Sequence, residues 1–174
     1  VLSFAGHHHM VYGAEASSGI FISGAFLTFF AFAFLTFEEV HLYTYVLFAV
    51  RVGFKLGWGC IAFYPFFYAY QLWAIAELPD PGSSNFMLII SVVIFLASWS
   101  LSRGANLQKY YFKKNPTRSF LGIKPETISD GNRTLLVNGF WGLSRHINYL
   151  GEIGMATGIV LALGYPMVPW PWLY

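Results

Sequence analysis

The chain is poor in charge. Charged residues make up 10% of its 174 residues, whereas soluble domains carry about 25%. Hydrophobic residues reach 56% and aromatic residues 20%, which is typical of surfaces that face lipid and the membrane interface. The shortage of charge argues against a soluble globular domain and favours a membrane protein.

Cysteine is almost absent. Cys60 is the one cysteine, so no disulfide can form within the chain, and its apolar surroundings predict a small buried side chain. The sequence also lacks an initiator Met, a signal-peptide pattern and a hydrophilic tail, and it ends inside an apolar run at Trp172-Leu173-Tyr174. We therefore expect a fragment that is cut at both ends.

Long apolar runs predict membrane spans, because a helix needs about 20 mostly apolar residues to cross a bilayer. Breakers separate the runs, notably the turn from Glu77 to Ser84, and Pro65 should kink one of them. The expected spans are Ser18 to Phe37, Gly57 to Ala76, Phe86 to Leu101 and Ile153 to Leu163, and Tyr165 to Tyr174 could open a fifth. The predicted fold is all-α: one transmembrane helical bundle over residues 1–174, with four to five spans.

Basic residues are few and unevenly placed. Eight of the ten Lys and Arg lie between Arg103 and Arg145, where only Glu126 and Asp130 oppose them. The positive-inside rule places this region in the cytoplasm and the turn at Asp80-Pro81-Gly82 on the opposite side. Such a region could hold an anionic ligand or lipid headgroups. Its position beside membrane spans argues against nucleic acid.

Two sequence blocks combine charge with aromatic residues. Arg103 to Pro116 reads RGANLQKYYFKKNP, and Leu135 to Glu152 reads LLVNGFWGLSRHINYLGE. The second block sets an Arg, a His, an Asn, a Tyr and a Glu directly before an apolar helix. Polar groups so close to a bilayer need partners or a ligand. The blocks therefore predict a binding site at the membrane surface.

These blocks resemble the membrane sterol reductases, which include C14- and C7-sterol reductases and the reductase-like part of the lamin B receptor. The resemblance covers Glu38 to Tyr174, and it implies reduction of a sterol carbon–carbon double bond with NADPH. It also implies a cytoplasmic cofactor-binding loop region over residues 103–147, and a sterol that enters laterally from the bilayer. Many members carry Asp where Cys60 stands, so no acid is carried over there. A further cofactor block near the family's C-terminus is not reached, so we expect this fragment to be inactive alone.

The resemblance assigns cofactor roles to individual residues. The cofactor-binding positions that it implies are Lys109, Lys113, Leu136, Trp141, Asn148 and Tyr149. If their segment is helical, Lys109 and Lys113 share one face and could grip phosphates, although lysines beside anionic headgroups are the alternative. Trp141 lies between two glycines that would admit a flat ligand. Interfacial anchoring is the alternative for the Trp and Tyr side chains.

The other candidates carry weaker signals, and the sequence identifies no catalytic residue. Tyr64, Tyr68 and Tyr70 could touch a sterol or donate a proton, but packing explains them as well. His146 fits a hydrogen-bonded structural residue, with Glu152 as partner of Arg145 or His146. His7-His8-His9 predicts a terminal loop or a tag remnant, because adjacent side chains do not converge on a metal. We expect no metal site.

Glycine pairs four residues apart, Gly53 with Gly57 and Gly154 with Gly158, predict close helix packing. This pattern favours packing within the chain, and the oligomeric state stays open.

Two other functions stay open. One is a membrane methyltransferase that uses S-adenosylmethionine, although such proteins usually have Pro where Ile147 follows His146. The other is a non-enzymatic membrane protein like the lamin B receptor. We expect a multi-pass protein of the endoplasmic reticulum in a eukaryote or of the inner membrane in a bacterium, in contact with membrane lipids.

Overall fold

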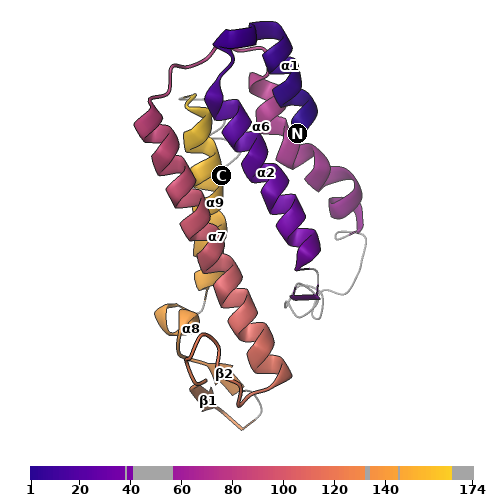
Figure 1. Cartoon of the computed structure of the whole chain (residues 1–174). Coiled ribbons are helices and arrows are strands. Elements are labelled where there is room, and N and C mark those ends of the chain that lie inside the picture. The colour runs from indigo at the N-terminus through magenta and orange to yellow at the C-terminus, as the bar shows by residue number, and fades with distance from the viewer. Residues whose placement is uncertain (38, 41–56, 132–133, 145, 166–174) are drawn as a thin grey trace. The chain divides into compact units, whose positions relative to one another are not determined.

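A computed structural model describes residues 1–37, 39–40, 57–131, 134–144 and 146–165. The elements in chain order are α1 (Leu2–Tyr12), η1 (Gly13–Glu15), α2 (Ser18–Thr36), the π-helical η2 (Gly59–Phe63), α6 (Tyr64–Ile75), α7 (Asn85–Lys114), β1 (Thr127–Ser129), β2 (Thr134–Leu136), α8 (Phe140–Leu143) and α9 (Ile147–Leu163) (Figure 1). Two compact units divide the chain, one comprising Val1–Phe95 with Ala156–Tyr174 and the other Leu96–Met155. The division passes through α7 and α9.

Helices form at all four of the main runs that were expected to span a membrane. Two of them, α2 and α7, are long and apolar enough to cross a bilayer, whereas α9 is a shorter apolar helix. In the second run, from Gly57 to Ala76, α6 starts with Pro65 in its first turn, directly after the π-helical η2. Proline is tolerated there because its missing N–H has no partner in that turn. The structure therefore supports helices at these places without confirming four to five spans.

The expectation of an all-α fold is wrong in one place. Strands β1 and β2 form an antiparallel hairpin in which Thr127 pairs with Leu136 and Ser129 with Thr134. Threonine is β-branched and favours extended backbone. Long apolar runs identified the helices, but strands of only three residues carry too short a pattern to be recognised in the sequence.

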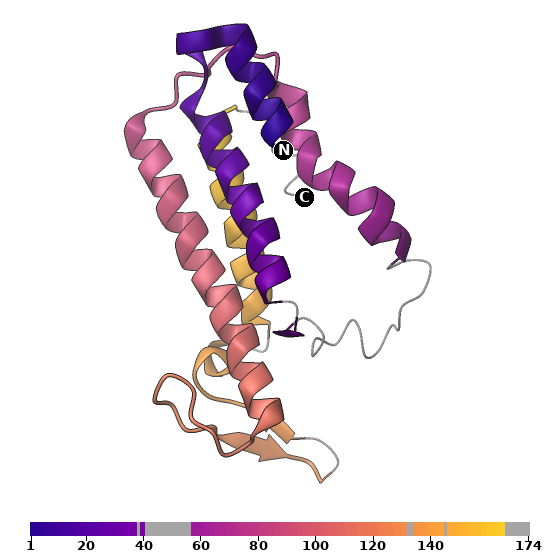
Figure 2. The same cartoon turned by 45° about the vertical axis from the view of Figure 1, so that its right-hand side comes forward.

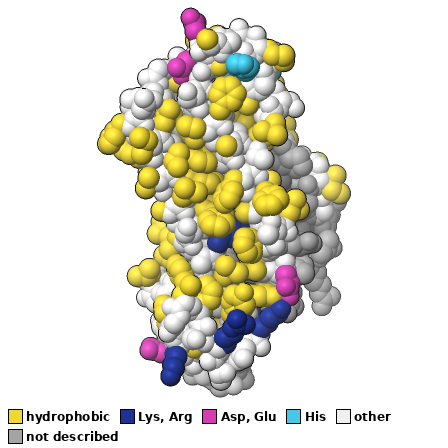
Figure 3. Space-filling model, in the orientation of Figure 1, with side chains coloured by type: hydrophobic (Ala, Val, Ile, Leu, Met, Phe, Trp, Pro, Cys, Tyr) yellow, Lys and Arg dark blue, Asp and Glu magenta, His cyan; other side chains and the backbone are white. Residues whose placement is uncertain are grey.

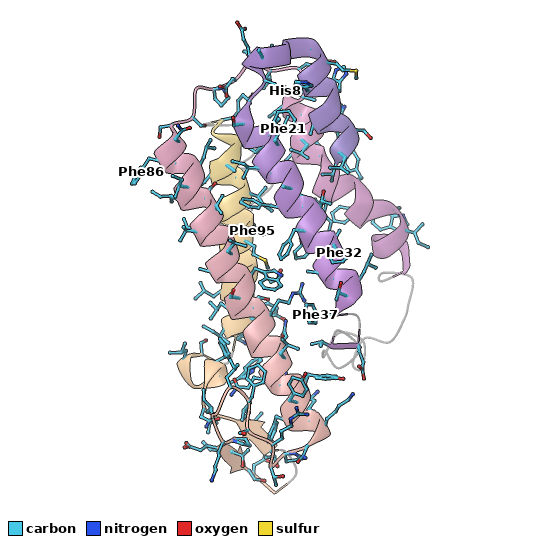
Figure 4. The ribbon with its side chains drawn as sticks, in the orientation of Figure 1. His8, Phe21, Phe32, Phe37, Phe86 and Phe95 are labelled. Atoms are coloured by element: carbon cyan, nitrogen blue, oxygen red, sulfur yellow. The ribbon has the colours of Figure 1, made fainter. Side chains whose placement is uncertain are left out.

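Small residues and one aromatic pair hold the first unit together. Figures 1 and 2 show α1 lying against α2 and α6. The ring of Phe95 on α7, labelled in Figure 4, stacks on that of Phe26 on α2, with their centroids 4.0 Å apart. Ser23 Oγ donates a hydrogen bond of 3.1 Å to the carbonyl oxygen of Ile159 on α9. Small side chains let helix backbones approach this closely.

One histidine of the N-terminal triplet is a core residue, so the interpretation as a loop or tag remnant is wrong. His8 lies on α1 with 0% exposure (Figure 4). The backbone N–H of Ser17 donates to its Nε2 at 3.0 Å, so Nδ1 carries the hydrogen and donates to the carbonyl oxygen of Ala76 at 3.0 Å. His8 therefore joins α1 to the end of α6.

The surface of the helices favours a lipid environment. Large hydrophobic side chains cover much of the face shown in Figure 3, and Phe32, Leu35 and Ile61 are 69%, 70% and 83% exposed. Only 22% of the most apolar stretch of α7 is buried. The core helix of a soluble protein would be mostly buried, because exposed apolar surface in water is unfavourable. These helices therefore fit a bilayer.

Replacing Gly19 with Val should destabilise the first unit. A Cβ at Gly19 would overlap the carbonyl oxygen of Ala162 on α9, and overpacking of this kind costs about 1–3 kcal/mol. The midpoint of thermal unfolding in detergent should fall. Gly6→Val is the matched control, because nothing lies within 4 Å of a Cβ at Gly6. Equal midpoints for the two variants would contradict this packing.

Candidate functional site

The basic residues expected in a loop begin on a helix. The region 103–147 is not a loop at its start, because α7 continues through residues 103–114 and ends at Lys114. No proline lies between Arg103 and Lys114, whereas Pro116 disfavours helical backbone in the residue before it. Lys109 and Lys113 therefore lie one turn apart on α7. Figure 3 shows Lys and Arg side chains gathered around the loops that follow this helix.

Lys109 is half-buried against an aromatic ring, beyond the apolar part of α7. Its Nζ lies 4.9 Å from the centroid of the Trp141 ring, a cation–π geometry. Burial lowers the pKa of Lys109, and the like charge of the more exposed Lys113 lowers it further. A bound anion would relieve that repulsion, so this pair is suited to phosphate.

Two other cations of this region rest on aromatic rings. Lys114 Nζ lies 4.6 Å from the centroid of Tyr110, and the guanidinium of Arg118 lies 4.7 Å from that of Tyr111. Rings beside charged groups hold the cations near the protein surface rather than free in solvent. Lys109 alone among these three lies against a residue of the second sequence block.

Trp141 lies on the one-turn helix α8, and the segment of residues 138–143 that includes α8, here called the Trp141 loop, is attached to α7. The indole Nε1 of Trp141 donates a hydrogen bond of 2.8 Å to the carbonyl oxygen of Ala105. Gly139 has φ 63°, a conformation that favours glycine. A Cβ there would overlap the side chain of Gln108, and at Gly142 it would lie 3.1 Å from the carbonyl oxygen of Val137. At these two glycines the protein's own atoms therefore lie at or near the place where a Cβ would be, and the close approach of a flat ligand to this loop stays a prediction.

Leu136 lies at the end of β2, on the strand that leads into this loop. It is half-buried and pairs with Thr127. Two hydrogen bonds fix the residues after it: Val137 N–H donates to the carbonyl oxygen of Glu126 at 2.9 Å, and Asn138 Nδ2 donates to that of Lys124 at 2.6 Å. The hairpin and the Trp141 loop therefore form one continuous framework.

Asn148 and Tyr149 lie in the first turn of α9. Asn148 is half-buried, and Tyr149 is 57% exposed with its ring stacked on that of His146, the centroids 5.4 Å apart. Among the described residues, no hydrogen bond or ring contact joins either one to Trp141. Of the predicted cofactor residues, the structure thus brings Lys109 and Trp141 into direct contact and leaves the α9 pair as a separate group.

Glu152 has a different partner from the one expected. Its Oε1 accepts a hydrogen bond of 2.7 Å from Ser102 Oγ on α7, and its charge attracts the buried Arg103. The prediction of a pairing with His146 is wrong, and Arg145 lies outside the described residues. The distance along α9 is the reason, since Glu152 is more than one helical turn beyond His146. Within the described part of the chain, no group of His, Cys, Asp or Glu could hold a metal.

The tyrosines proposed for the sterol belong to the first unit. Tyr68 on α6 has its ring 5.7 Å from that of Phe30, and Tyr70 lies 5.9 Å from Trp73 with 36% exposure. The side chain of Tyr64 lies outside the described residues. Aromatic packing therefore accounts for the contacts seen at Tyr68 and Tyr70.

Sequence reasoning missed Gln108, which supports the Trp141 loop. Its carboxamide bonds to backbone atoms of Asn138 and Phe140. Gly104 and Ala105, four and three residues earlier, lie on the same helix face. A glutamine one helical turn after two adjacent small residues was the signal available in the sequence.

Comparison with known proteins identifies the family. All residues 1–174 match the family model described as the ergosterol biosynthesis ERG4/ERG24 family. The chain belongs to this family. It is 32% identical over 168 residues to Delta(14)-sterol reductase of Arabidopsis thaliana, covering 94% of this chain and 43% of that protein. It is 30% identical over 173 residues to Delta(14)-sterol reductase of Methylotuvimicrobium alcaliphilum, covering 95% and 39%.

A mammalian member of the ERG4/ERG24 family is also similar. Delta(14)-sterol reductase of Mus musculus is 37% identical over 131 residues, which cover 75% of this chain and 31% of that protein. The chain thus spans less than half the length of these relatives. The match includes residues 1–37, where the sequence had shown only hydropathy, so α1 with its buried His8 is part of the family domain. The sterol reductase resemblance is confirmed, and with the two apolar helices it indicates a membrane protein.

Proposed function

We propose that the protein containing this chain reduces a carbon–carbon double bond of a sterol with NADPH. Family membership supports sterol reduction. The observation that supports the cofactor is the pair of cations on α7, with Lys109 held over Trp141 and Lys113 one turn on. Two ammonium groups at this spacing suit phosphates of a dinucleotide.

The charge and the hydrogen-bonding groups of several described residues support this cofactor. Lys109 and Lys113 bind phosphate, and Trp141 offers the ring face not covered by Lys109. The half-buried amide of Asn148 can bond to a carboxamide or ribose hydroxyl. NADPH supplies the hydride when bound. The residues of the second unit hold and orient it, and fixing the reacting groups in place is itself a large part of catalysis.

The sterol double bond follows from the relatives. The similar proteins from Arabidopsis thaliana and Mus musculus are named Delta(14)-sterol reductases, so we propose the Δ14 bond as the substrate bond here. A sterol is almost wholly apolar and would enter laterally from the bilayer. The helices α2, α6, α7 and α9 would each cross the membrane, with the loops after α7 in the cytoplasm.

The test is a reductase assay on the full-length protein. Purified in detergent and given a Δ14-unsaturated sterol, it should form the saturated product with NADPH, and more slowly with NADH, which lacks the extra phosphate. NADPH should also raise its thermal unfolding midpoint, whereas S-adenosylmethionine should not. Product formation with a Δ7 sterol only would overturn the assigned bond. Stabilisation by S-adenosylmethionine instead of NADPH would overturn the reaction class.

A further inference from the structure

Gln108 makes two hydrogen bonds with one side chain. It lies on α7 and is only 3% exposed. Its Nε2 donates to the carbonyl oxygen of Asn138 at 3.2 Å, and its Oε1 accepts from the backbone N–H of Phe140 at 3.0 Å. The two bonded residues flank Gly139. The carboxamide therefore holds the backbone on both sides of a left-handed glycine.

The Trp141 loop packs so closely against α7 that two glycines at the contact have no room for a Cβ. A Cβ at Gly139 would overlap the Gln108 carboxamide, and a Cβ at Gly104 would overlap the ring of Phe140. Trp141 adds its hydrogen bond to the carbonyl oxygen of Ala105. Residues 138–141 are thus fastened at three points to a single stretch of helix, residues 104–108.

We infer that Gln108 is a positioning residue of the cofactor site, a role that rests on the proposed NADPH function. Lys109 is the next residue on the helix, and its position follows from the α7 backbone. Trp141 comes from the loop, so its position depends on how firmly the loop is attached. Gln108 therefore fixes the position of the Trp141 ring relative to Lys109. A bound nucleotide would contact this ring next to the phosphate that Lys109 binds.

Few side chains at position 108 could make both hydrogen bonds to the loop. The loop presents one acceptor, the carbonyl of Asn138, and one donor, the N–H of Phe140. A carboxamide supplies a donor and an acceptor side by side, whereas an ionised carboxylate only accepts and methionine does neither. Asparagine has both groups but is one methylene shorter. The carbonyl of Asn138 and the N–H of Phe140 are partly buried. If they lose their hydrogen bonds to Gln108, an open loop that exposes them to water becomes more favourable.

The experiment compares Gln108→Met with Gln71→Met in the full-length protein. Gln71 is a second buried glutamine, 1% exposed, and neither atom of its amide has a hydrogen-bond partner among the described residues. It lies on α6, so its replacement removes an equivalent amide without touching the loop. Gln108→Met should raise the Kd and KM for NADPH about tenfold, since apparent affinity falls with the fraction of closed loop. The kcat at saturating NADPH should be nearly unchanged, and Gln71→Met should bind NADPH like the unsubstituted protein.

Hydrogen exchange without cofactor provides the structural readout. Amides of residues 138–141 should exchange faster in Gln108→Met than in Gln71→Met, while those of α9 stay the same. If Gln108→Met does not fold, Gln108→Asn replaces it, with the same expected direction. Tight NADPH binding that neither Gln108 variant weakens would overturn this inference alone. No NADPH binding by the unsubstituted protein would overturn the proposed function and this inference with it.

Discussion

Replacing Lys109 or Lys113 with Ala is expected to weaken NADPH binding to the full-length protein by about 1–3 kcal/mol each, the scale of a hydrogen bond to a charged group. That is about a five- to 150-fold rise in Kd. The cause is the loss of one of two ammonium groups a helical turn apart on α7. The loss at Lys109 should be the larger, because this side chain is half-buried and already held over Trp141.

The control for net charge is Lys124→Ala. Lys124 is exposed, and only its backbone carbonyl contributes to the loop, through the bond from Asn138. Its side-chain removal should leave the Kd for NADPH unchanged by isothermal titration at fixed ionic strength. If Lys124→Ala weakened binding as much as Lys109→Ala, a diffuse positive field rather than a site would explain the affinity.

The pH dependence of binding provides an independent check. Burial and the charge of Lys113 lower the pKa of Lys109, so its ammonium is lost at a lower pH than that of an ordinary lysine. NADPH affinity should therefore decline in the alkaline range before ordinary lysines titrate. The Lys109→Ala variant should lack this early decline.

Replacing Glu152 with Leu is expected to lower the free energy of unfolding by about 1–3 kcal/mol, the cost of losing a hydrogen bond to a charged group. Arg103 is 3% exposed and is attracted by Glu152, which also accepts the hydrogen bond from Ser102. The thermal unfolding midpoint in detergent measures the effect. The midpoint of the Glu152→Gln variant should lie between those of Glu152→Leu and the unsubstituted protein, because glutamine keeps an acceptor for Ser102 but removes the charge.

A double substitution separates charge pairing from packing. Arg103→Met combined with Glu152→Leu also removes the buried guanidinium that Glu152 attracts, so no charge remains that loses this attraction. The double variant should therefore recover much of the stability lost in Glu152→Leu. Glu126→Leu, on the exposed loop before the hairpin, is the control and should have little effect. If the loss of stability in the double variant equalled the sum of the losses in the two single variants, Arg103 and Glu152 would not be coupled.

The outcomes at His8 and Glu152 show why the sequence misled at particular residues. Three adjacent histidines point in different directions, and nothing local shows that the middle one meets the carbonyl of Ala76, which is 68 residues away. The partner of Glu152 is Ser102, 50 residues earlier in the chain. A search of the neighbouring sequence offered only His146 and Arg145. Both partnerships depend on which helices pack together, and that is not a local property.

The sequence by itself determined the membrane character, the positions of the apolar helices and the family. These follow from composition, from runs of apolar residues and from two motif blocks, all of which are local patterns. The spacing of Lys109 and Lys113 placed them on one face only if their segment was helical, and the structure supplied that helix, α7. Only the tertiary structure decided what the glycines of the Trp141 loop accommodate. What lies beside a residue without a Cβ depends on what packs there, and at Gly139 the side chain of Gln108 on α7 lies where a Cβ would be.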